Sequence, residues 1–116
     1  MGDTKCKARP AWVVVSIGIV IGALLALPAL FIAIASGGAG HGDYVWARAL
    51  FPLTMLLMLI EGTIGPIGIT VALLQFPFYG GLAGWTLTRR NYLAVGLAAS
   101  IHLIAVVACF SGLLPP

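Results

Sequence analysis

Charged side chains are scarce in this sequence: only 8% of its 116 residues are Asp, Glu, Lys or Arg, whereas 61% are hydrophobic. A water-soluble domain has about 25% charged residues, because its surface must face water. So few charges exclude a soluble globule of this size, and lipid becomes the solvent for most side chains. We therefore predict an all-α integral membrane protein that lies in a lipid bilayer.

Signatures of catalysis and of metal binding are also absent from the sequence. The three acidic residues, Asp3, Asp43 and Glu61, form no pair of neighbouring carboxylates, and Cys6 and Cys109 stand far apart with no Cys/His cluster. There is no Walker loop, Rossmann fingerprint, GxSxG or HExxH motif. We therefore expect no enzyme, no metal and no cofactor. Five of the six cations flank apolar runs, Arg48 lies within the second run, and no basic patch forms, so we expect no nucleic-acid partner either.

Four apolar runs make up most of the remaining chain. At 1.5 Å per residue, about 20 helical residues cross a hydrocarbon core of ~30 Å. The second run is the shortest, at about 24 Å, and needs Arg48 and Glu61 to snorkel toward the headgroups. We expect one domain, a bundle of four transmembrane helices, with spans at 11–35, 45–60, 66–87 and 92–114 and a Gly-rich loop at 36–43.

The first run also raises the possibility of a secretory signal peptide, because a positive lead precedes it and Ala33-Ile34-Ala35 resembles a cleavage site. A signal peptide has an apolar core of about 7–15 residues. The uncharged run from Ala11 to Ala35 is much longer. We therefore expect an uncleaved helix that begins on the cytoplasmic side of a cell membrane, as in a bacterial inner membrane.

The distribution of positive charge leaves a three-span alternative open. With four spans, three N-terminal cations remain in the cytoplasm, while Arg48 and the pair Arg89-Arg90 lie outside. With three spans, Arg48 alone lies outside, which fits the cytoplasmic bias of Lys and Arg better. Residues 44–65 would then form a re-entrant or interfacial segment. The N-terminal cations are Lys5, Lys7 and Arg9.

Two physical arguments favour four spans over three. Arg48 and Glu61 lie about 140° apart on a helical wheel, so the second run lacks the single polar face of an interfacial helix. An irregular backbone exposed to lipid costs several kcal/mol for each unpaired polar group. We therefore predict a multi-pass protein with four crossings.

Two groups of residues have the positions expected of helix-packing and interface-anchoring side chains. Glycines four residues apart let helix backbones approach closely, and aromatic and cationic side chains collect where a helix leaves the hydrocarbon. The packing candidates are Gly18, Gly22, Gly80 and Gly84. The interface anchors are Trp12, Trp46, Arg48, Trp85, Arg89 and Arg90.

Glu61, Gln75 and His102 form the candidate polar site within the membrane. A polar or ionisable group at this depth is expensive and often functional. The neighbours of His102 on its helix face are small, so we expect that face to meet another helix, with a neutral imidazole bonded to Gln75 or to a freed backbone carbonyl.

These observations favour a structural or accessory membrane protein that acts through helix packing, either with itself or in a larger complex. The alternatives are a small transporter or channel subunit that uses Glu61 and His102, and a membrane enzyme. The chain is similar in outline to the small multidrug transporters. That family carries a carboxylate deep within its first span, and residues 11–35 contain none, so the resemblance implies architecture alone.

Overall fold

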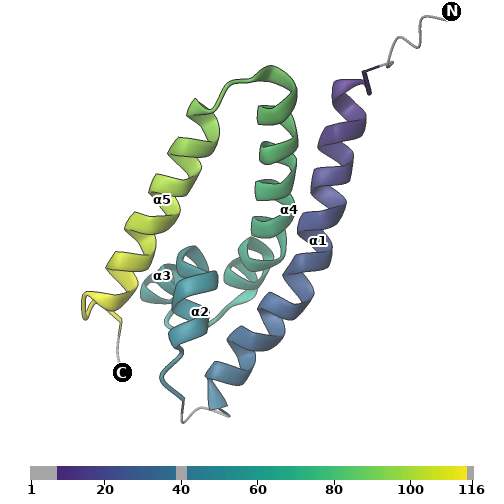
Figure 1. Cartoon of the computed structure of the whole chain (residues 1–116). Coiled ribbons are helices and arrows are strands. Elements are labelled where there is room, and N and C mark those ends of the chain that lie inside the picture. Colours follow the sequence, from purple (N-terminus) through teal and green to yellow (C-terminus); the bar gives the residue numbers. More distant parts are fainter. Residues whose placement is uncertain (1–7, 39–41, 115–116) are drawn as a thin grey trace, which may run out of the picture.

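The described chain is all-helical, as the sequence predicts. The computed structural model describes residues 8–38 and 42–114, and it contains no strand within those ranges. Lys5, Cys6, Lys7 and His41 lie outside the described residues, as do positions 39–41 of the Gly-rich loop. The helices are α1 (Ala11–Ser36), α2 (Val45–Leu50), α3 (Pro52–Glu61), α4 (Pro66–Arg89) and α5 (Leu93–Phe110) (Figure 1).

Three of these helices, α1, α4 and α5, are long and apolar enough to cross a membrane. Helices α1 and α4 extend to Ser36 and Arg89, close to the predicted limits. Helix α5 ends at Phe110, short of the predicted 114. It stops because Gly112 adopts a left-handed conformation with φ 88°, and the Ser111 hydroxyl donates to the Ala108 carbonyl.

Residues 45–60, expected as one continuous span, form two short helices with a break at Phe51 (φ −128°, ψ 52°). Pro52 explains the break, because proline has no N–H and its ring clashes with the carbonyl four residues earlier. It instead occupies the first turn of α3. Helices α2 and α3 have 6 and 10 residues, about 9 and 15 Å, and neither alone spans a ~30 Å core. The structure therefore does not confirm a four-span bundle.

The three long helices alternate in direction, so α4 runs antiparallel to both α1 and α5. Helices α2 and α3 are inserted at one end of this bundle. The start of α1 and the α4–α5 turn lie at the same end of the molecule, and α2 and α3 lie toward the other end, between α5 and the α1–α4 pair (Figure 1). Helices α1 and α4 pack along most of their length, whereas α4 and α5 make far fewer contacts.

The α1–α4 pair is held together at glycines, where the two backbones touch. A Cβ placed on Gly18 would fall on the Gly80 carbonyl oxygen, and one on Gly22 would fall on that of Phe76. One on Gly84 would come within 2.7 Å of the Val14 carbonyl oxygen. Gly18 and Gly80 face each other, Gly22 lies against Phe76 and Gly84 against Val14, so the candidate packing glycines of both runs line one antiparallel contact within the chain. We call this contact the glycine seam.

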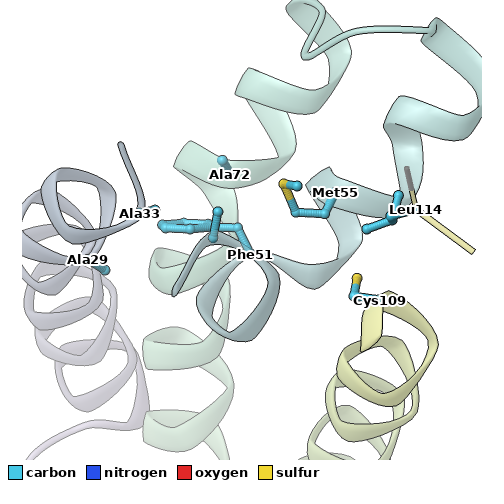
Figure 2. Packing of buried hydrophobic residues seen from close by; sticks show 8 residues of the cluster. Ala29, Ala33, Phe51, Met55, Ala72, Cys109 and Leu114 are labelled. Carbon is cyan, nitrogen blue, oxygen red and sulfur yellow. The ribbon is translucent and has the colours of Figure 1, made fainter. Parts of the chain in front are cut away.

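The buried apolar cluster gathers around α2 and α3. Helix α3 crosses the first turns of α4. Two side chains of α3 that are seven residues apart, Thr54 and Glu61, both bond to the backbone of Gly68. Phe51 reaches toward Ala33 on α1, and Met55 lies on the side of Cys109 and Leu114 (Figure 2). The cluster consists of Ala29, Ala33, Ala47, Phe51, Met55, Ala72, Cys109 and Leu114.

Candidate functional site

The break between α2 and α3 interrupts the helical bonding of the backbone, and the carbonyls of Ala49 and Leu50 there accept from side chains of other helices. Backbone bonds flank the break, from Phe51 N–H to Ala47 and from Met55 N–H to Phe51. Among the turn, loop and cap backbone bonds of the described residues, none donates to Ala49 or Leu50. A buried carbonyl without a donor costs about 1–3 kcal/mol, so these two groups need side-chain partners.

Gln75 and His102 supply those partners. The Gln75 Nε2 amide donates to the Leu50 carbonyl at 2.8 Å, and the side chain is only 5% exposed. The His102 Nε2 lies 3.1 Å from the Ala49 carbonyl oxygen. Gln75 comes from α4 and His102 from α5, so the opened backbone joins both long helices to α2. The Gln75 Oε1 atom is buried and has no hydrogen-bond partner within the described part of the chain.

The bonding of His102 defines its tautomer. A carbonyl oxygen can only accept, so Nε2 carries the proton and donates to Ala49. Nδ1 lies 3.0 Å from the Tyr79 hydroxyl, and in a neutral ring it accepts the hydroxyl proton. From the sequence we predict that His102 forms a hydrogen bond with Gln75 or with a freed backbone carbonyl. The structure gives it the Ala49 carbonyl together with Tyr79, while Gln75 bonds elsewhere.

Tyr79 and Cys109 complete this site, which we call the break cluster (Gln75, Tyr79, His102 and Cys109 around the α2–α3 break). Cys109 is fully buried, and its thiol donates to the Pro52 carbonyl at 3.4 Å. Tyr79 is not among the site residues predicted from the sequence. Its position four residues after Gln75, on the same face of α4, is the signal that points to it.

Aromatic rings continue the break cluster across α4. The Tyr79 and His102 rings meet edge-on, with centroids 5.7 Å apart. Phe76 lies 6.5 Å from Tyr79 and 5.4 Å from Phe51, measured between centroids. Tilted and edge-on pairs at these distances are favourable for aromatic rings. Phe51 lies at the break itself, and it packs against Phe76 of α4 as well as against its apolar neighbours.

Glu61 lies outside the break cluster and stabilises the start of α4. Its Oε2 accepts from the Gly68 N–H at 3.3 Å, and the Thr54 hydroxyl donates to the Gly68 carbonyl at 3.0 Å. Gly68 lies in the first turn of α4, where backbone N–H groups lack helical partners and negative charge is favourable. Gly68 and Tyr79 are eleven residues apart, about 16 Å along α4. Glu61 and His102 therefore do not share a site.

The anchoring residues lie at the two ends of the long helices. Trp12, Trp85, Arg89 and Arg90 belong to the end that carries the α4–α5 turn, whereas Trp46 and Arg48 belong to α2 near the opposite end (Figure 1). Both tryptophans near the α4–α5 turn are exposed, as are the two arginines. Aromatic and cationic side chains at both ends of an apolar bundle are the pattern of membrane interfaces.

Among the described residues, no group of three or more His, Cys, Asp or Glu side chains is placed to hold a metal ion. Comparison of the chain with family models, curated proteins and solved structures finds no match. The fold and the apolar surface define the class: a helical membrane protein with three helices able to cross a bilayer.

Proposed function

We propose that this chain is a small multi-pass accessory protein of the cell membrane. In this proposal α1, α4 and α5 cross the bilayer, the N-terminus is cytoplasmic, and α2–α3 forms a re-entrant segment. The protein acts by packing α5 against a second copy or against a helix of a larger complex, and performs no catalysis of its own.

The break cluster supports three crossings instead of four. The main objection to a re-entrant segment is the cost of unpaired backbone in lipid. Here the opened carbonyls of Ala49 and Leu50 are paired with His102 and Gln75, and irregular backbone is tolerated at membrane depth where protein covers and bonds it. Charge supports the same topology, because Arg9, Arg89 and Arg90 then share the cytoplasmic side.

The exposure of α5 is the observation that carries the packing proposal. Only 11% of its spanning window is buried, against 22% for α1 and 28% for α4. Its outer face presents Gly96 and Ser100, four residues apart and both exposed. A Cβ on Gly96 would have no neighbour within 4 Å. Small residues at this spacing let a further helix approach, whereas the glycines of the seam are already covered within the chain.

Substitutions on the outer face of α5 test this function. Gly96→Leu and Ser100→Leu should weaken association of the purified protein, because a large side chain forces neighbouring helices apart. Val107→Leu, at an exposed site with little change in volume, is the matched control. The measurement is the mass of the protein in mild detergent and in bilayers, together with any co-purifying subunit. A strict monomer without a partner in both media would refute the proposal.

Glu61 and His102, the two residues named for the transporter alternative, lie apart. Glu61 bonds to the start of α4, and both ring nitrogens of His102 have partners in α2 and α4. We therefore do not propose coupled transport through these two residues.

A further inference from the structure

An apolar groove runs between α4 and α5. It has a volume of about 480 Å³, and the Tyr79 and His102 polar groups on its wall bond to each other or to the backbone. A second hollow of about 560 Å³ shares Tyr79, Leu82 and Ala98 with this groove as lining residues. Neither wall carries a charged side chain. The groove therefore suits hydrocarbon better than a polar molecule.

The turn that closes this groove carries positive charge. Arg89 ends α4, and Arg90 follows it in a left-handed conformation with φ 50°. The Asn91 side chain accepts from the Leu93 N–H at 3.1 Å and so fixes the start of α5. Arg89 and Arg90 are exposed, and the described acids, Asp43 and Glu61, belong to segments of the opposite end. Within the described residues, no carboxylate at this end competes for the two guanidinium groups.

The charge and the groove lie at a spacing that suits one molecule. Ala83 is the groove residue of α4 nearest the turn, and it precedes Arg89 by six residues, about 9 Å. On α5 the groove wall extends from Val95 to Leu103, about 12 Å. Arg89, with Arg90 next to it, thus lies within about 9 Å, along α4, of the apolar groove wall.

We propose that this groove is a binding site for one anionic phospholipid. Its phosphate is bound by Arg89 and Arg90, and one acyl chain lies between α4 and α5. Arginine binds phosphate oxygens through paired N–H donors, and basic pockets between membrane helices recognise anionic headgroups. The hydrocarbon chain supplies the packing contacts that the groove wall otherwise lacks. A monomer contains the whole site, so this inference does not depend on the association proposed above.

Lipid retention by the purified full-length chain tests the site. Native mass spectrometry in mild detergent compares phosphatidylglycerol with phosphatidylcholine of identical acyl chains. Two arginines near the headgroup predict a preference of about 30-fold for the anionic lipid. The double variant Arg89→Gln/Arg90→Gln should lose that preference, and inorganic phosphate should not displace the lipid, because it has no chain to fill the groove.

Groove variants separate a true site from a charged surface. Ala99→Trp and, independently, Leu103→Trp should reduce retention of both lipids by filling the groove, while Leu25→Trp on the exposed face of α1 should retain them as the wild type does. Using two groove variants guards against one that fails to fold. Equal retention of both lipids by the wild type would overturn the proposal. So would full retention by a folded groove variant, displacement by phosphate, or an equal loss in Leu25→Trp.

Discussion

Two backbones approach closely at Gly18 and Gly80, and adding one methyl group to either residue tests this contact. Gly18→Ala and Gly80→Ala each place a Cβ on the carbonyl oxygen of the facing glycine. Gly96→Ala is the matched control, because its Cβ meets nothing within 4 Å. All three substitutions lie inside helices, so each gains the same helix propensity, about 0.8–1.0 kcal/mol. That gain cancels in the comparison.

The remaining difference is steric, and its size follows from the seam. A Cβ on Gly18 would lie 2.9 Å from the Gly80 carbonyl carbon, whereas an optimal carbon–carbon contact is about 3.5–4.0 Å. Helices α1 and α4 must therefore separate by at least about half an ångström. Overpacking of this kind costs about 1–3 kcal/mol. We expect Gly18→Ala and Gly80→Ala each to be less stable than Gly96→Ala by about that amount.

Unfolding in mixed detergent micelles, followed by the fluorescence of the tryptophans, measures this difference. The double variant Gly18→Ala/Gly80→Ala should cost less than the sum of the single variants, because the first substitution already separates the helices. Equal stability of Gly18→Ala, Gly80→Ala and Gly96→Ala would show that the two backbones do not touch, and the seam would be refuted.

Two further predictions concern the break cluster and the topology. His102→Leu should lower the free energy of unfolding by about 1–3 kcal/mol, because the partly buried Ala49 carbonyl loses its donor. His102→Gln, which keeps a donor and an acceptor, should cost less, and equal losses in the two variants would contradict the hydrogen-bond account. Reporter fusions after Pro116 and within residues 37–42 should both lie on the side opposite the N-terminus. A C-terminal reporter on the same side as the N-terminus would refute three crossings.

Composition and run length were sufficient to predict a helical membrane fold and the positions of α1 and α4. They did not reveal how the second run would divide. Pro52 marks where this run is interrupted, but a continuous helix is the favourable prediction for an apolar run of this length when no partner for the opened carbonyls is known. Those partners, Gln75 and His102, lie 25 and 53 residues away from the groups they bond. Periodicity along one segment carries no information about contacts at such separations.

The candidate packing glycines are a second case in which the sequence predicts positions but not contacts between distant residues. Spacing identified Gly18, Gly22, Gly80 and Gly84 as positions of close helix approach, but it did not show that the two pairs meet. Both pairs lie along one seam, so they cannot also serve an outside partner while the fold is intact. Gly96 was overlooked because Ser100, not a second glycine, completes its spacing.

The residues of the break cluster are synthesised at different times, and this order has a consequence for the assembly of the protein in the membrane. Residues 45–61 are synthesised before all three of Gln75, Tyr79 and His102, and during translation their opened carbonyls have no bonding partner in the chain already made. The partners of this segment are therefore complete only once α4 and α5 have been made. We expect the short pair α2–α3 to settle between the long helices after these have been inserted.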